Sequence, residues 1–247
     1  MRALFLFLLS ISQLQAQPRS PANGHSHNDY QQVAPFSLAY QAQLGSIEAD
    51  VFLKNGELFV AHFPMDIKPE RSLNLLYLQP LMAVFRQNKG KIYANYPLQL
   101  LIDLKTPASP TLDTLVSQLK RYPELLQSAV KIVISGNMPA PEQFKNYPDW
   151  ISFDGRLNQT YSAETLPRVA LISASFTEFS KWKGEETLLE TDRLKLMEAI
   201  QKAHSLNKKI RFWATPDTPK TWQTLLDLGA DWIGTDKPVK LARFLRK

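Results

Sequence analysis

Residues 46–51 read Ser-Ile-Glu-Ala-Asp-Val, a stretch in which polar and apolar side chains alternate. Because successive side chains of a β-strand point to opposite faces, the carboxylates of Glu48 and Asp50 share one face and the three apolar side chains share the other. In a closed barrel the apolar set faces the surrounding helices, so the two carboxylates project into the interior. The alternative is a pair of exposed acids on an edge strand.

Short apolar runs alternate with longer helical patterns along the rest of the chain, which predicts a parallel sheet covered on both faces by helices. We predict strands over residues 46–53, 98–104, 130–135, 150–153, 169–173, 210–214 and 232–235, a short strand at Gly24, and a hairpin return over 58–62. Helices are predicted over 35–44, 75–87, 112–126, 191–205, 220–228 and 239–245. The eight parallel strands would close an α/β fold, a TIM (β/α)8 barrel. A doubly wound open sheet is the alternative, but no Gly-x-Gly-x-x-Gly motif follows the first strand.

The length and composition fit this architecture. An α/β barrel commonly occupies 200 to 250 residues as one domain, and the chain has 247. Hydrophobic residues make up 44% and charged residues 21%, which excludes a disordered or low-complexity chain. The absence of cysteine excludes disulfides, thiolate nucleophiles and cysteine-based metal sites, leaving histidine and carboxylates as metal ligands. The net charge of +6 suits anionic partners, although solvated Lys and Arg give the same value.

The first residues predict a secretory signal peptide. An apolar run up to Leu9 follows Arg2, and a polar stretch leads to the small residue Ala16. We expect cleavage after Ala16, so that residues 1–16 are the signal and 17–247 form the single barrel domain. The apolar run is shorter than the roughly 20 residues of a spanning helix, which disfavours a membrane anchor. A secreted or periplasmic location follows.

A third carboxylate is expected beside the first two. Asp103 and Lys105 end the strand over 98–104 on one face, at the carboxyl end where such barrels carry their chemistry. Neighbouring buried carboxylates resist ionisation unless a cation joins them, and a hard ion, Mg²⁺ or Ca²⁺, is suited to oxygen ligands. Lys105 beside that ion can hold a phosphate oxygen, or form only a local ion pair.

The turn Asn55-Gly56 folds the chain back along the first long strand. A two-residue turn would set His62 opposite Ala49, on the wrong face. A three-residue loop over 54–56, with Gly56 left-handed, would set it opposite Glu48. We predict the three-residue loop, which leaves His62 beside the carboxylates.

Two further imidazoles lie in residues 24–30, which read Gly-His-Ser-His-Asn-Asp-Tyr, so three of the four histidines belong to one constellation. Imidazole gives or takes a proton near neutral pH, which phosphoryl transfer requires at both the nucleophile and the leaving oxygen. The fourth, His204, is expected at a surface or helix end.

Taken as an ordered set, these motifs and the closing Ile-Gly-Thr-Asp-Lys-Pro at 233–238 resemble the glycerophosphodiester phosphodiesterase and phosphatidylinositol phospholipase C-like superfamily. The resemblance runs from about Asn23 to the C-terminus. The chain looks in particular like the branch of altered inheritance of mitochondria protein 6, which shares the Gly-His-Ser-His-Asn-Asp-Tyr opening.

The resemblance implies a role for each motif residue. Glu48, Asp50 and Asp103 would bind the divalent ion, His25 and His62 would be the acid and base, and Lys105 would contact phosphate. Trp213 matches a tryptophan that lines the head-group pocket in related barrels, with a core aromatic as the alternative. The common diesterases carry His-Arg-Gly where this chain has His25-Ser26-His27, and usually Glu at the position of Asp103. The Arg of that motif would contact phosphate, and this chain has Ser26 in its place. His27, Asn28 or Arg211 would supply the contact instead.

The sequence thus predicts a metal-dependent phosphoric diester hydrolase that acts on glycerophosphodiesters or a related phospholipid head group. The alternatives are a non-catalytic phosphate- or lipid-binding barrel and a secreted glycosidase, whose acids must flank a sugar ring. We expect a monomer with a small-molecule substrate, no nucleic-acid partner, and at most a transient membrane-surface contact. The basic C-terminal stretch over 237–247 is expected to be the last barrel helix.

Overall fold

Eight parallel strands close into a barrel in the computed structural model of the chain, which describes residues 19–127 and 129–247. Around the barrel the order is β1, β9, β8, β7, β6, β5, β4 and β2, and β1 pairs with β2 to close it. The strands are β1 (Gly24–Ser26), β2 (Ser46–Lys54), β4 (Leu98–Leu104), β5 (Val130–Gly136), β6 (Ile151–Gly155), β7 (Val169–Ser175), β8 (Lys209–Trp213) and β9 (Trp232–Thr235), with β3 (Glu57–Val60) added antiparallel to β2. The predicted TIM barrel is confirmed.

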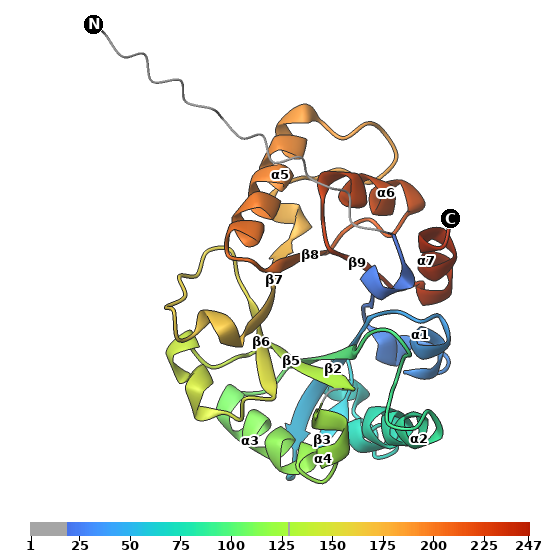
Figure 1. Ribbon diagram of the computed structural model, residues 1–247, viewed down its shortest axis with the longest axis vertical. Helices are drawn as coiled ribbons and strands as arrows, with labels where there is room; N and C mark the ends of the chain where they lie inside the picture. The colour runs from blue at the N-terminus through green and yellow to red at the C-terminus, as the bar shows by residue number, and fades with distance from the viewer. Residues whose placement is uncertain (1–18, 128) are drawn as a thin grey trace, which may run out of the picture.

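Helices lie outside the ring of strands (Figure 1). They are α1 (Ser37–Gln41), α2 (Gln79–Gln87), α3 (Ala108–Leu119), α4 (Pro123–Leu126), α5 (Glu190–Ser205), α6 (Pro219–Leu228) and α7 (Pro238–Leu245), and a π-helical turn (Asn74–Leu78) precedes α2. After β5 and β6 the described chain forms only the short 3₁₀ turns Pro141–Asn146 and Leu166–Arg168. Proline supplies no backbone N–H, and the prolines in these segments oppose longer helices.

The predicted helix over 112–126 is wrong in one respect, because the structure divides it into α3 and α4. Pro123 begins the second helix as its first residue. A proline inside a continuous helix would remove a hydrogen bond and clash with the preceding turn, whereas the first position needs no N–H. The C-terminal prediction is confirmed, since α7 buries Leu241, Ala242 and Leu245.

The predicted three-residue loop between β2 and β3 is also wrong. Lys54 pairs with Glu57, so the turn is the two residues Asn55 and Gly56, with φ of 53° and 78°. Two left-handed residues twist in the sense of the flanking strands, which favours this turn. The strand β3 ends at Val60, so His62 lies beyond the paired residues. The strand register therefore does not dictate the direction of its side chain.

The barrel interior is layered. Paired residues of parallel neighbours point to the same side, so the match of Asp50 with Asp103 places both carboxylates inside. Beneath this polar layer lies a separate buried cluster that consists of Leu101, Val133, Leu171 and Trp232. The opposite faces of the strands pack under the helices: Ile47, Ala49 and Val51 are all fully buried in the main core.

Among the described residues, no helix has the length and apolar character needed to cross a bilayer. The predicted signal peptide over 1–16 lies outside the described residues.

Gly45, which precedes β2, should not tolerate a side chain. A Cβ atom there would lie 2.1 Å from the carbonyl oxygen of Ala22, a backbone atom held because Gly45 donates its N–H to Pro21. We expect Gly45→Ala to lower the free energy of unfolding by about 1–3 kcal/mol, measured by urea denaturation. Gly234→Ala is the control, since its Cβ would meet its nearest atom at 3.8 Å. Equal unfolding midpoints for the two variants would contradict this account.

Candidate active site

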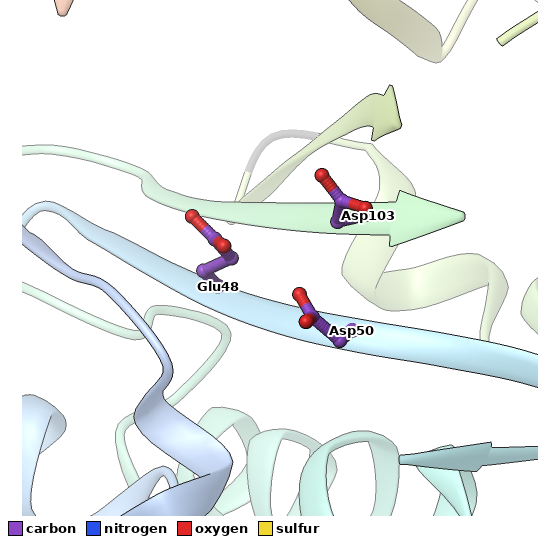
Figure 2. A group of neighbouring side chains, drawn as sticks. All are labelled: Glu48, Asp50 and Asp103. Atoms are coloured by element: carbon purple, nitrogen blue, oxygen red, sulfur yellow. The ribbon is translucent and has the colours of Figure 1, made fainter. Parts of the chain in front are cut away.

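Three carboxylates converge at the carboxyl end of two neighbouring strands. Glu48 and Asp50 project from β2 and Asp103 from the adjacent β4 (Figure 2). One oxygen atom of each lies within 4.8 Å of the others. Glu48 and Asp50 are 5% and 1% exposed. The three acids expected to share a site are therefore brought together by the register of one strand pair.

Lys105 lies over two of these acids. Its Nζ is 3.0 Å from Oδ2 of Asp50 and 2.8 Å from Oδ1 of Asp103. Burial, together with the charge of Glu48, nevertheless raises the pKa of Asp50 to about 6. Burial also raises the pKa of Asp103. One lysine thus leaves these two carboxyls short of positive charge.

Arg211 on β8 is the buried partner of Glu48. Its Nη1 donates to Oε2 of Glu48 at 2.7 Å and contacts Nε2 of His25. Burial opposes ionisation of Glu48, but the guanidinium and the hydrogen bond from His25 outweigh it and hold the pKa of Glu48 well below its usual range. Sequence analysis considered Arg211 only as a phosphate contact. Its alternation with Phe212 in β8 was the signal that it faces inward with Trp213.

His25 is fixed on both sides of its ring. Nδ1 lies 2.8 Å from Oγ of Ser46 and Nε2 lies 2.8 Å from Oε2 of Glu48. The side chain is fully buried, and burial together with the charge of Arg211 lowers the pKa of His25 to about 4. The imidazole is therefore neutral at neutral pH and held in one orientation.

His62 is connected to the carboxylates through Tyr30, which the sequence analysis did not single out. The Tyr30 hydroxyl lies 2.7 Å from Oδ2 of Asp50, 2.8 Å from Oδ1 of Asn28 and 2.9 Å from Nδ1 of His62. Nδ1 of His62 is also 3.6 Å from Oδ2 of Asp50, and its side chain is 41% exposed. A single phenol thus connects an expected metal ligand, an expected substrate contact and an expected acid or base. Its place in the opening motif was the available signal.

Two other expected substrate contacts, His27 and Trp213, lie beside His25. His27 and Trp213 line a hollow of about 140 Å³ with Arg211. Trp213 is 45% exposed, so the core-aromatic alternative is wrong. Nδ1 of His27 lies 2.8 Å from Oδ1 of Asp236 and 3.0 Å from Nδ2 of Asn28.

Asp154 is a further buried acid that sequence analysis missed. Its Oδ2 accepts from Oγ of Ser135 and lies 2.9 Å from Nη1 of Arg156, and it is 3.8 Å from Nη2 of Arg211. Asp154 directly follows the predicted strand over 150–153, and Asp103 likewise lies at the carboxyl end of the predicted strand over 98–104. The same pattern could have found it.

The donor set fits a hard divalent cation. All three clustered acids offer oxygen, the ligand type of Mg²⁺ and Ca²⁺. Oδ1 of Asp50 is buried and has no hydrogen-bond partner among the described residues. A buried, unpaired carboxylate oxygen is costly unless a cation or proton reaches it. The cluster can therefore accept such an ion.

Comparison with known proteins agrees with this fold and motif order. The family model of the AIM6-like phosphodiesterase domain matches residues 16–139, half of the chain. The chain is 28% identical to altered inheritance of mitochondria protein 6 of Eremothecium gossypii over 89% of this chain and 68% of that protein. It is 27% identical to the homolog of Arthroderma benhamiae, over 87% and 81% of the two chains.

Two solved structures share the barrel. A glycerophosphodiester phosphodiesterase from Parabacteroides distasonis has a TM-score of 0.59 at 16% identity, with 91% of this chain and 96% of that chain covered. A glycerophosphodiester phosphodiesterase from Agrobacterium tumefaciens has a TM-score of 0.52 at 13% identity, with 93% and 97% covered. The TM-scores show that this chain shares their fold. The family model, matched across the opening motif, β2 and β4, shows that this chain belongs to the AIM6-like phosphodiesterase domain family.

Proposed function

We propose that the chain is a metal-dependent phosphoric diester hydrolase that acts on glycerophosphodiesters or a related phospholipid head group. The observation that carries the proposal is the cluster of Glu48, Asp50 and Asp103, whose oxygen atoms lie within 4.8 Å of one another between two imidazoles. Membership of a phosphodiesterase family and a barrel shared with two glycerophosphodiester phosphodiesterases support it.

Glu48, Asp50 and Asp103 would hold Mg²⁺ or Ca²⁺. When bound, the ion would supply Lewis-acid stabilisation of the charge that develops on a phosphate oxygen. Lys105 has an ammonium group already within 3.0 Å of two of the acids and is 29% exposed at its side chain. It can therefore donate to a second phosphate oxygen by a charge-assisted hydrogen bond.

His25 and His62 are proposed to carry the protons. Cleavage forms a bond from an attacking oxygen to phosphorus, breaks the bond to the leaving oxygen, and moves one proton from the first oxygen to the second. The attacking group is water or a neighbouring hydroxyl of the substrate. Ser46 and Glu48 hold the ring of His25, and Tyr30 holds His62, so each ring enters the reaction already oriented.

The arrangement supports a phosphodiesterase rather than a glycosidase. Glycosidase carboxyls flank the sugar ring from two sides, about 5 Å or more apart. Here two of the acids are on one strand, and the third pairs directly opposite Asp50. The alternative is a barrel that binds phosphates or lipids without catalysis. Binding of diesters without hydrolysis, across a panel of substrates, would favour that alternative. A secreted or periplasmic monomer remains our prediction for location and assembly.

Binding of the divalent ion should be measurable without turnover. Mg²⁺ or Ca²⁺ should raise the thermal unfolding midpoint, because a ligand at 100 times its Kd stabilises a protein by about 2.7 kcal/mol. EDTA should reverse the shift and abolish hydrolysis of a panel of glycerophosphodiesters and lysophospholipids. Asp50→Asn should remove the shift, whereas Asp113→Asn, an exposed acid on α3, should retain it. An equal shift in both variants would place the ion elsewhere.

Loss of either imidazole should reduce kcat on the best substrate of that panel by about 10²- to 10⁴-fold, the usual effect of removing a positioned acid or base. The variants are His25→Gln, which retains polar contacts in a buried position, and His62→Ala. His204→Gln is the control, since this histidine contacts Asp231 at the end of α5. Full activity in either site variant, with unchanged circular dichroism, would refute the assignment.

Tyr30→Phe should lower kcat by about tenfold or more while leaving KM nearly unchanged, because the phenol orients His62 and Asp50 and does not bind substrate. Tyr93→Phe is a matched control: Tyr93 is also buried and donates its hydroxyl to the carbonyl of Leu44 at 3.0 Å, outside the site. Both variants should lose about 1 kcal/mol of stability. Equal kcat values would reduce Tyr30 to a structural role.

A further inference from the structure

The amino-terminal end of the barrel, opposite the carboxylate cluster, contains a second cavity. It is open to solvent on one side and has a volume of about 630 Å³, within the usual range for small-molecule sites. Interior-facing residues at the starts of the strands form part of its lining: Gln99, Lys131, Ser152, Lys209 and Trp232. Trp232 belongs to the buried cluster that also contains Leu101, Val133 and Leu171, and the latter three separate the other lining residues from the carboxylates of Asp50 and Asp103. The cavity is therefore distinct from the candidate active site.

Lysines give this cavity a strong positive charge. Lys131 and Lys209 occupy inward positions at the open amino end of β5 and β8, where both side chains are exposed, and Lys208 lines the same cavity. In the described part of the chain, none of the three lies within 4.0 Å of a carboxylate oxygen. The one acid of the lining, Asp149, is already 3.5 Å from Arg168. Three lysines thus line one cavity without an ion-pair partner among the described residues.

One of the three lysines is partly withdrawn from solvent. Lys208 is half-buried, and burial lowers the pKa of its amine. Sites that break the usual rules of barrel packing without a compensating partner commonly serve a ligand. A phosphate monoester carries a charge of about −1.5 to −2 at pH 7, which complements the lysines.

Aromatic and apolar surfaces complete the cavity. Trp232 is 8% exposed, and Nζ of Lys209 lies 5.2 Å from the centroid of its ring. Trp150, Tyr96 and Val169 line the same space. A site with planar side chains and a few convergent charges fits a ligand that joins a flat ring to an anion.

We propose that this cavity is a binding site for a small organic phosphate that carries a planar ring, such as a nucleoside monophosphate. Lys131 and Lys209 hold the phosphate, and Trp150 contacts the ring. The site lies at the opposite end of the barrel from the proposed hydrolytic centre and does not depend on it.

The test is calorimetric titration of the full chain with adenosine 5′-monophosphate in EDTA, which keeps metal-dependent binding at the carboxylate cluster out of the measurement. We expect saturable binding that Lys131→Met combined with Lys209→Met weakens by about tenfold or more. Lys202→Met, which removes the same charge from an exposed position of α5, should leave the affinity unchanged. Diesterase activity should be retained in the double variant, because neither lysine belongs to the proposed catalytic machinery.

Inorganic phosphate and adenosine separate the two parts of the proposal. Each should bind more weakly than the nucleotide, and Trp150→Ala should weaken the nucleotide but not inorganic phosphate. Equal affinity for nucleotide and inorganic phosphate would overturn the ring contact. Absence of saturable binding at millimolar nucleotide, or an equal loss in the Lys202→Met control, would overturn the site as a whole.

Discussion

Burial of several carboxylates in one barrel interior is the constraint on which the site depends. Glu48, Asp50 and Asp154 are almost inaccessible to water, where an ionised carboxyl is costly unless it is paired. Arg211 compensates Glu48, yet Oδ1 of Asp50 and Oδ1 of Asp154 have no partner among the described residues. The protein carries this electrostatic cost at the carboxyl end of its strands, where barrel enzymes perform their chemistry.

The scaffold around these acids gives the two imidazoles different surroundings. His25 is enclosed between Ser46 and Glu48, and burial keeps it neutral at neutral pH. His62 is partly exposed and is held from one side by Tyr30. Pairs of proton-transfer groups commonly differ in this way, because one must accept a proton while the other donates it.

Charge is distributed unevenly along the barrel axis. Acids gather at the carboxyl end, whereas Lys131 and Lys209 face inward at the amino end, and the layer containing Leu101 lies between them. The net charge of +6 therefore says little about either end. What a partner meets is the local field, which depends on which strand positions face inward.

Periodicity predicted the strands and placed Glu48 and Asp50 on one face, because alternation in a strand fixes which side chains lie together. The number of strands favoured a closed barrel over an open sheet, and closure is what turns these acids and Asp103 inward. The sequence did not determine the turn at Asn55-Gly56 or the position of His62, since the chain leaves the ladder after Val60 and no local pattern records where it goes. Arg211, Tyr30 and Asp154 come from segments far apart in the chain. Only closure of the barrel brings them to the acids, because contacts between distant segments depend on strand order and register rather than on local sequence.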